Sequence, residues 1–113
     1  MIKVMWFLKR ADHLSLEEFR EWWTEHHAPD VRADQSPQLQ RYVVNVRENR
    51  DELPGKPPHA DDSEPEWDGV AEQWFASEAE FAEIYASDDR RVRVDAAAHT
   101  SRFMRLIVRE WSI

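Results

Sequence analysis

The sequence predicts a single α+β domain with a four-stranded antiparallel sheet in the order βαββαβ, which is the ferredoxin-like arrangement. Three observations predict it. Four segments carry the β-branched, apolar and aromatic residues that are typical of strands. Two helical segments, each preceded by a capping serine, separate these strands in the order that the fold requires. A length of 113 residues with 42% hydrophobic residues suits one domain around one core.

The first strand and the first helix follow from composition and capping. Residues 2–9 are rich in β-branched and aromatic side chains, which predicts a strand. Ser15 and Glu18 have the spacing of a capping box, which marks the start of a helix. Pro29 disfavours helical geometry at the residue before it, so we expect the helix to end at about His27.

The middle of the chain combines one strand with a long polar loop. Residues 30–38 show no regular pattern, and residues 39–47 read as the second strand. Residues 48–66 contain four prolines, a glycine and many acids, which predicts an exposed loop. The loop could also act as a lid over a site. The acids that we expect to be solvated there are Asp61, Asp62, Glu64 and Glu66.

The last part of the chain repeats the order of strand, helix and strand. Residues 67–75 form the third strand, and Ser77 with Glu80 forms a second capping box. A further helical segment is expected over residues 90–98, followed by the fourth strand over residues 103–111.

Charge and composition exclude several classes of function. The net charge of −8 argues against nucleic acid and against an anionic membrane surface as partners. The absence of cysteine excludes disulfides, thiolate catalysis and cysteine-based metal sites. No apolar run approaches the ~20 residues that span a bilayer, and the apolar start lacks the features of a signal peptide. We therefore expect a cytoplasmic protein.

Strand alternation divides the predicted sheet into two faces. One face is almost wholly apolar, and we expect it to lie under the helices. Its residues are Ile2, Val4, Trp6, Leu8, Tyr42, Val44, Val46, Val70, Glu72, Trp74, Met104, Leu106 and Val108. The other face mixes apolar and basic residues, which suits the interface of a homodimer packed sheet against sheet. That interface would bury Phe7, Phe75, Ile107 and Trp111.

Glu72 breaks the pattern of the apolar face. A carboxylate in an apolar site is costly unless it is paired or protonated, which makes Glu72 a candidate for a functional site. A structural ion pair with an arginine, or a bond from a tyrosine, is the alternative. A strand register shifted by one residue would place Glu72 on the other face.

The stretch over residues 19–29 combines an aromatic stripe with two histidines. His27 follows Trp23 by four residues and shares its core-facing stripe, whereas His26 follows Trp22 by four residues and points to the flank. Histidine exchanges protons near neutral pH, so His27 is a candidate acid or base. The alternative is a histidine that interacts with the dipole at the helix end.

Other candidates have a structural and a functional interpretation. His99 either caps a helix or reaches a pocket, and Tyr42 either packs in the core or donates a hydrogen bond to a substrate oxygen. We expect Asp95 to form an ion pair with neighbouring arginines, and His13 and His59 to be exposed in loops.

Metal and cofactor chemistry has weak support in the sequence. His26 and His27 lack the spacing of four residues that helical metal pairs use. Convergence of His27, Glu72 and His99 into a site with two histidines and one carboxylate remains open. No phosphate-binding loop, nucleotide fingerprint or serine elbow is present, and the lack of a serine elbow and of cysteine argues against covalent hydrolysis.

These motifs resemble the EthD-like family of the dimeric α/β-barrel superfamily. The matching stretches are residues 5–10, 14–20, 22–29 and 68–75 and the helix that contains Asp95. The resemblance implies a homodimer whose two sheets close a barrel, with a small cavity between sheet and helices in each subunit. It also implies functional roles for His27, Glu72 and Asp95. The chain departs from the family in its acidic loop and in carrying His99 where an aromatic residue is more usual.

The resemblance implies several activities. Relatives include dehydratases of polyketide intermediates, methylmuconolactone isomerases and accessory proteins of ether degradation, and the superfamily includes monooxygenases without cofactors and haem-handling proteins. We expect a cofactor-free lyase or isomerase, dehydratase-like, that transfers a proton through His27 on a small cyclic or aromatic oxygenated substrate. Glu72 would assist, and Tyr42 or His99 would bind the oxygen. The residues expected to bind the substrate are His26, Trp23, Trp74 and Trp6.

Three alternatives remain. The same pocket would serve a small-molecule-binding accessory protein for an oxygenase pathway that has no activity of its own. A histidine that binds haem or a metal, and a cofactor-free monooxygenase, are the other two.

Overall fold

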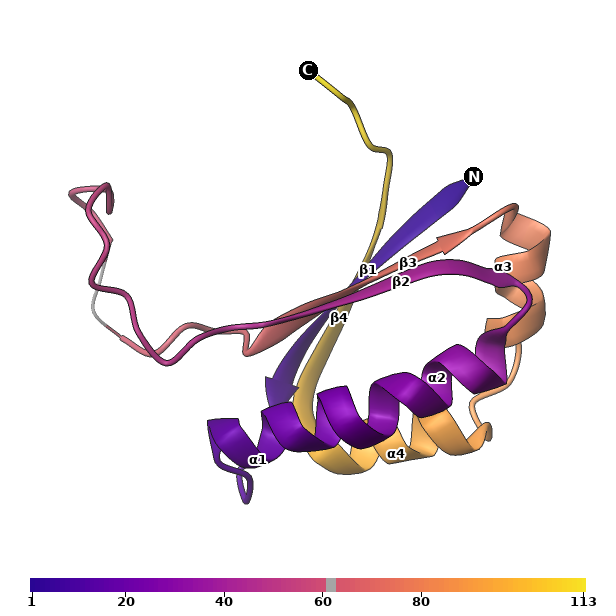
Figure 1. The fold of residues 1–113 in the computed structure, drawn as a ribbon, viewed down its shortest axis with the longest axis horizontal. Coiled ribbons are helices and arrows are strands. Elements are labelled where there is room, and N and C mark those ends of the chain that lie inside the picture. The colour runs from indigo at the N-terminus through magenta and orange to yellow at the C-terminus, as the bar shows by residue number, and fades with distance from the viewer. Residues whose placement is uncertain (61–62) are drawn as a thin grey trace.

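Four antiparallel strands form a sheet in the order β2-β3-β1-β4, and all helices pack on one side of it (Figure 1). This computed structural model describes residues 1–60 and 63–113. The strands are β1 (Ile2–Arg10), β2 (Leu39–Val46), β3 (Gly69–Phe75) and β4 (Thr100–Val108). The helices are α1 (Leu16–Glu21), the π-helical turn η1 (Trp22–His27), α2 (Ala28–Gln35), α3 (Glu78–Tyr85) and α4 (Arg91–His99). The order βαββαβ and the α+β class are confirmed.

The first helical segment starts where the capping box predicts. The Ser15 hydroxyl accepts a hydrogen bond from the Glu18 backbone N–H, and the Glu18 carboxylate accepts one from the Ser15 N–H. These two bonds satisfy backbone donors that the start of a helix leaves free.

The expected end of this segment at His27 is wrong, because the helix continues to Gln35. In η1, the Ala28 N–H bonds to the Trp23 carbonyl five residues earlier, which widens one turn. Pro29 then lies in the first turn of α2, directly after the wider turn of η1. The proline therefore begins a second helical segment, and most of the stretch expected to be irregular is helical.

The fourth strand begins and ends three residues earlier than expected. The carbonyl of His99, at the end of α4, accepts a hydrogen bond from the Ala11 N–H at 2.9 Å, which brings Thr100 beside Arg10 at once. Pairing with β1 ends at Val108, because β1 itself begins at Ile2. Residues 109–113 therefore extend away from the sheet (Figure 1).

The register of β3 corrects the expected faces of the sheet. Gln73 lies opposite Val4, which is fully buried under the helices, and Glu72 lies opposite Met5. Because directly paired residues share a face, Gln73 and Phe75 face the helices, whereas Glu72 and Trp74 face outward. β3 carries apolar residues at both odd and even positions. The alternation of apolar and polar residues therefore does not determine which face of β3 is buried.

The register of β4 also reverses the faces that we expected for this strand. Phe103 lies opposite Leu8 and Ile107 opposite Val4, so both share the helix side of the sheet. Met104 and Leu106 therefore point outward, although we expected them under the helices. Apolar residues again occupy both odd and even positions of the strand. Of the four residues expected in a sheet-to-sheet interface, Phe75 and Ile107 thus lie on the helix side.

The long loop is exposed throughout residues 48–60 and 63–66, as expected, and it projects from the domain (Figure 1). Asp61 and Asp62 lie outside the described residues. Glu66 pairs with Arg102 at 2.5 Å, and Glu64 also forms ion pairs. Glu64 and Glu66 therefore form ion pairs, although we expected them to be solvated.

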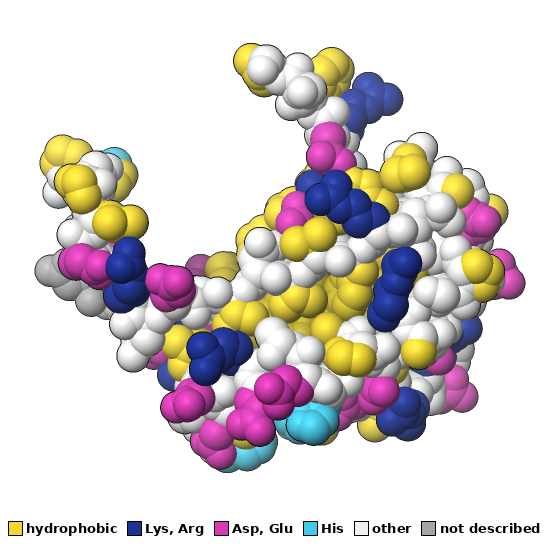
Figure 2. All heavy atoms as spheres, viewed as in Figure 1, with side chains coloured by type: hydrophobic (Ala, Val, Ile, Leu, Met, Phe, Trp, Pro, Cys, Tyr) yellow, Lys and Arg dark blue, Asp and Glu magenta, His cyan; other side chains and the backbone are white. Residues whose placement is uncertain are grey.

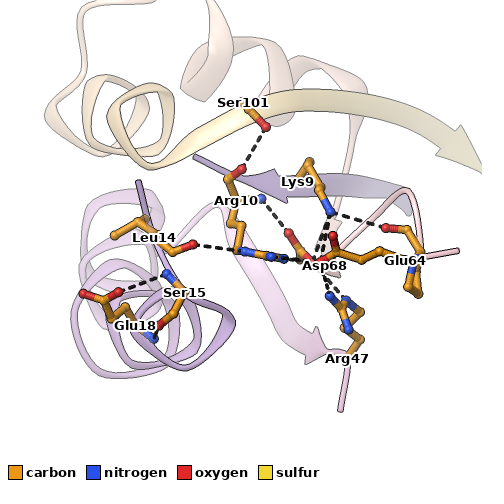
Figure 3. Close-up of polar contacts among 10 residues, drawn as sticks. Lys9, Arg10, Leu14, Ser15, Glu18, Arg47, Glu64, Asp68 and Ser101 are labelled. Carbon is orange, nitrogen blue, oxygen red and sulfur yellow. Dashed lines mark hydrogen bonds and ion pairs between the residues drawn. The ribbon is translucent and has the colours of Figure 1, made fainter. Parts of the chain in front are cut away.

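A charged cluster holds the base of this loop against the sheet (Figure 3). The fully buried carboxylate of Asp68 accepts hydrogen bonds from the Arg10 N–H and guanidinium, both at 2.8 Å, and from Arg47 Nε at 2.9 Å. Glu64 accepts a bond from Arg47 and pairs with Arg10. Burial alone would raise the pKa of Asp68, but the bonds from Arg10 and Arg47, with the charge of Lys9, together lower it.

The core forms two apolar clusters, and Trp6 and Tyr42 pack against both. One lies beneath α2, α3 and α4 and includes Val4, Val31, Leu39, Phe75, Phe81, Ile84 and Val92. The other lies beneath α1 and η1 and includes Leu8, Phe19, Trp22, Trp23 and Ala71. Within the part of the chain that the structure describes, no helix is long and apolar enough to cross a membrane.

Candidate functional site

A cavity of about 610 Å³ lies between the helix side of the sheet and helices η1, α2 and α4. Its volume is within the range of small-molecule sites. Its apolar walls include Trp6, Leu8, Trp23, Val31, Val92 and Phe103. Figure 2 shows apolar side chains gathered between the sheet and the helices on the face drawn there.

His27 enters the cavity from η1 with its side chain only 8% exposed. Its Nδ1 lies 3.0 Å from the Asp95 Oδ2 atom of α4. A carboxylate accepts hydrogen bonds, so this contact favours the tautomer in which Nδ1 carries the proton and Nε2 is a free acceptor. Among the described residues, Nε2 has no hydrogen-bond partner. The imidazole therefore offers a basic nitrogen to a molecule in the cavity.

The environment of His27 favours its neutral form. Burial lowers the pKa of His27, and the hydrogen bond and charge of Asp95 offset part of this effect. The imidazole is therefore neutral at pH 7, which is the state that accepts a proton.

Asp95 is surrounded by aromatic rings that fix its position. Trp22 Nε1 donates a hydrogen bond to Asp95 Oδ2 at 3.1 Å. The Trp22 ring stacks on His27 with centroids 4.6 Å apart and on His99 at 4.3 Å. His99 Nδ1 lies 2.8 Å from the backbone carbonyl oxygen of Asp95 and 3.2 Å from Asp95 Oδ1.

The expected pairing of Asp95 with neighbouring arginines is wrong. Arg91 instead pairs with Asp30 at 3.2 Å, and Arg93 pairs with Asp88 at 2.8 Å. The carboxylate of Asp95 therefore interacts with His27, His99 and Trp22.

A polar network forms another wall of the cavity. Gln73 Oε1 accepts hydrogen bonds from Trp6 Nε1 at 2.8 Å and from the Tyr85 hydroxyl at 2.7 Å, and Gln73 Nε2 donates to Gln35 Oε1 at 2.8 Å. Gln35 Nε2 donates to the Tyr85 hydroxyl at 3.0 Å. Both glutamines are 2% exposed. Networks of this kind hold side chains in one arrangement.

Sequence reasoning missed Gln35, Gln73 and Tyr85. One signal could have found Gln73. In the correct register, it is the polar residue among apolar neighbours on the helix side of β3, which is the anomaly that was assigned to Glu72.

Four of the expected site residues line the cavity, namely His27, Tyr42, Trp6 and Trp23. Burial raises the pKa of Tyr42, so its hydroxyl stays protonated and can donate a hydrogen bond. His99 touches Asp95 and Trp22 but does not line the cavity.

Glu72 lies outside the cavity, on the outer face of the sheet. Its carboxylate is 2.8 Å from Lys3 Nζ and accepts a hydrogen bond from Asn45 Nδ2 at 3.0 Å. These two bonds lower the pKa of Glu72. The structural alternative, an ion pair, is therefore the one observed, with a lysine as partner. The sheet separates Glu72 from His27. His27, Glu72 and His99 therefore cannot bind one metal ion together.

Trp74 and His26 also lie outside the cavity. The Trp74 ring is on the outer face, where Lys3 Nζ lies 4.5 Å from its centroid and its Nε1 donates to Glu110 Oε1. His26 is exposed, and its ring nitrogen lies within 4.8 Å of carboxylate oxygens of Glu21 and Glu25. His13 and His59 are exposed, as expected.

Solved structures with the same fold support this architecture. An EthD-like protein from Ralstonia eutropha JMP134 matches with a TM-score of 0.68 and 18% identity, over 95% of this chain and 88% of that one. An EthD family protein from Bacillus halodurans C-125 matches with a TM-score of 0.63 and 15% identity, over 98% and 99% of the two chains. A dimeric protein with a ferredoxin-like fold from Bacteroides fragilis NCTC 9343 matches with a TM-score of 0.57 and 14% identity, over 95% and 93%.

Comparison with domain families gives a more specific result. A search of curated proteins gives no match to this chain. The EthD domain, in contrast, matches residues 11–104, which include all the helices, strands β2 and β3 and the first part of β4, but not β1. The chain therefore belongs to the EthD family.

Proposed function

We propose that this protein is a cofactor-free lyase or isomerase that transfers a proton on a small cyclic or aromatic oxygenated substrate, with His27 as the general base. The observation that carries the proposal is the His27–Asp95 pair, in which Nδ1 is held by a carboxylate and Nε2 is free at a cavity wall. This arrangement prepares one nitrogen of a neutral imidazole to accept a proton.

The proposed step begins with a C–H group next to a substrate carbonyl. Nε2 takes that proton, an enolate forms, and the resulting imidazolium is stabilised by the Asp95 carboxylate 3.0 Å from Nδ1. The imidazolium then returns the proton either to a departing hydroxyl, which gives dehydration, or to another carbon, which gives isomerisation. Proton transfer by a positioned group contributes ~10²–10⁴-fold to a rate.

We assign the supporting roles to residues that reach the cavity or hold His27. Tyr42 would donate a hydrogen bond to the substrate oxygen, because its raised pKa keeps the phenol protonated. Trp6 and Trp23 would enclose the ring of the substrate. His99 would act as a positioning residue through Asp95 rather than by touching the substrate.

We also propose that the protein is a homodimer that uses the outer face of the sheet. Met104 and Leu106 are 39% and 44% exposed on that face. The long loop and residues 109–113 project on the side of the sheet opposite the helices (Figure 1), where they would flank a second copy. The dimeric protein from Bacteroides fragilis shares the fold.

An accessory protein that binds the same ligand without converting it is a second candidate. One observation favours it: Glu72 lies outside the cavity, so the expected pair of proton-transfer groups is reduced to His27. A binding protein requires only the enclosed aromatic walls and the polar network.

An exchange experiment tests the proposal against this alternative. A panel of enolisable cyclic ketones and lactones is incubated with the protein in D₂O, and loss of the α-proton signal is followed by NMR. An enzyme of the proposed kind accelerates exchange of at least one compound, and His27→Ala abolishes the acceleration. A compound that binds without any accelerated exchange would support the accessory protein.

A further inference from the structure

The lining of the cavity differs in charge from the rest of the protein. The chain contains 23 acidic residues and 15 lysines and arginines. The described residues that line the cavity nevertheless include Arg93, Arg102 and Arg105 and no Asp or Glu. A cleft lined by one sign of charge attracts ligands of the opposite sign. The lining therefore favours an anionic ligand in an otherwise acidic protein.

Two of these three arginines are already paired. Arg93 Nη1 lies 2.8 Å from Asp88 Oδ1, and Arg102 Nη1 lies 2.5 Å from Glu66 Oε1. Arg105, in contrast, has no carboxylate partner among the described residues. It is the cavity arginine that can bind an incoming anion without first losing an ion pair.

The position of Arg105 suits this role. It lies opposite Trp6 in the β1–β4 register, so it shares the helix side of the sheet with the cavity. Its guanidinium carbon is 5.9 Å from the ring centroids of both Trp6 and Phe81. The exposed residues of the lining all come from α4 and β4, which places the mouth of the cavity between these elements; they are Ala97, Ser101, Arg102, Phe103 and Arg105. Arg105 therefore stands at the entrance, above an aromatic wall.

We propose that the cavity takes a cyclic or aromatic ligand that carries a carboxylate, and that Arg105 binds this carboxylate at the mouth. This inference names the substrate class of the proposed function and rests on the same cavity. A guanidinium presents two parallel N–H groups that match a carboxylate. With the carboxylate at Arg105, the ring of the ligand packs against the aromatic wall that Trp6 and Phe103 form together, and its inner end approaches the wall that contains His27.

Binding of matched ligands tests the inference. The probes are 2-naphthoate and the neutral 2-naphthamide, measured by isothermal titration calorimetry at pH 8 and low salt. His27 is neutral at this pH because its pKa is lowered, so its charge does not contribute. We expect the wild-type protein to bind 2-naphthoate about tenfold more tightly than 2-naphthamide, as a charge-assisted bond would give.

Two variants separate Arg105 from a general effect of charge. Arg105→Gln is expected to weaken 2-naphthoate binding about tenfold and to leave 2-naphthamide unchanged. Arg109→Gln is the matched control, because Arg109 follows β4, stacks on Trp111 and does not line the cavity. It makes the same change in net charge, and we expect it to retain the preference for 2-naphthoate.

The inference is overturned by three results: equal affinity for the two probes, no binding of either probe, or a preference that survives in Arg105→Gln. Equal losses in Arg105→Gln and Arg109→Gln would also overturn it. The outcome is independent of the proposed proton transfer, because binding requires no turnover. His27→Ala measured in both assays keeps the two claims apart, since it should lose exchange and keep the preference for 2-naphthoate.

Discussion

His27 Nδ1 lies 3.0 Å from Asp95 Oδ2, which joins the π-helical turn η1 to helix α4 across 68 residues of sequence. The π-helical turn has a direct consequence for this contact. It places Trp22 and His27 in a stack, although they are five residues apart, and both side chains bond to the same carboxylate oxygen. π-Helical turns are rare and are often found at functional sites.

Asp95→Asn tests the contribution of this carboxylate. An amide supplies no negative charge to stabilise the imidazolium, and its N–H₂ group can turn toward Nδ1 and favour the wrong tautomer. We expect kcat for the exchange reaction to fall by ~10²-fold, with KM little changed. A variant in which only KM rises would show that Asp95 shapes the site without supporting proton transfer.

The rate should depend on pH through His27. Burial lowers its pKa below the ordinary value of 6.5, and only the neutral imidazole accepts a proton. We therefore expect the rate to rise as pH increases through a midpoint below 6.5 and to be constant at pH 7 and above. Asp95→Asn removes the charge that raises this pKa, so its midpoint should move to still lower pH. A pH–rate profile in both proteins checks these directions.

Tyr42→Phe removes the proposed hydrogen bond to the substrate oxygen. The shape of the cavity is retained, because only one buried hydroxyl is lost. We expect kcat/KM to fall about tenfold, as for one hydrogen bond that strengthens in the transition state. Circular dichroism would confirm that the variant is folded. Unchanged kcat/KM would remove Tyr42 from the site.

Asp68→Asn tests the charged cluster that holds the loop. Removing the buried negative charge leaves Arg10 and Arg47 with only the half-exposed Glu64 as a shared charged partner, which we expect to cost about 2–3 kcal/mol after allowing for the partial exposure of the arginines. Urea unfolding measures the loss. Glu66→Gln is the matched control, and its exposed pair with Arg102 should contribute less than about 1 kcal/mol.

The same cluster predicts a pH dependence of stability. The pKa of Asp68 is lower in the folded protein than the ordinary 3.8 of the unfolded chain. Its contribution should therefore be complete above that value and be lost as pH falls through the folded pKa. The stability difference between the wild-type protein and Asp68→Asn should shrink in that range, and a constant difference down to pH 2 would contradict the assignment.

Leu106→Glu tests the outer face of the sheet as a dimer interface. A new carboxylate buried where Leu106 packs in the interface is costly, so we expect dissociation into monomers. Val94→Glu on α4 is the control, because Val94 is 57% exposed on the helical side of the domain. Sedimentation should show a dimer for the wild-type protein and the control. A wild-type monomer would contradict the proposed interface.

Much of the fold could be predicted because local signals specify it. Ser15 and Glu18 mark the helix start by direct bonding, and the alternation of β1 correctly placed Val4 and Leu8 in the core. His27 was correctly directed toward the helix–sheet space, since it shares a stripe with Trp23.

The register of the later strands depends on contacts that the sequence does not display. β3 and β4 carry apolar residues at both odd and even positions, so either face of each strand could have been buried. The observed register includes backbone irregularities between Lys9 and Arg10 and between Leu39 and Arg41, and it buries Gln73 where Gln35 bonds to it, and none of these contacts is visible in a local pattern. The π-helical turn was also missed, because a hydrophobic pattern read at 3.6 residues per turn contains no sign of a wider one.

The most direct test of the central claim compares His27→Gln with His13→Gln in the exchange reaction at pH 7.5. His13 is exposed in a turn, so its replacement controls for the loss of a histidine elsewhere in the chain. We predict that His27→Gln lowers kcat by ~10²–10⁴-fold while ligand affinity and folding are preserved, and that His13→Gln is unchanged. Equal rates in the two folded variants would contradict the proposal that His27 transfers the proton.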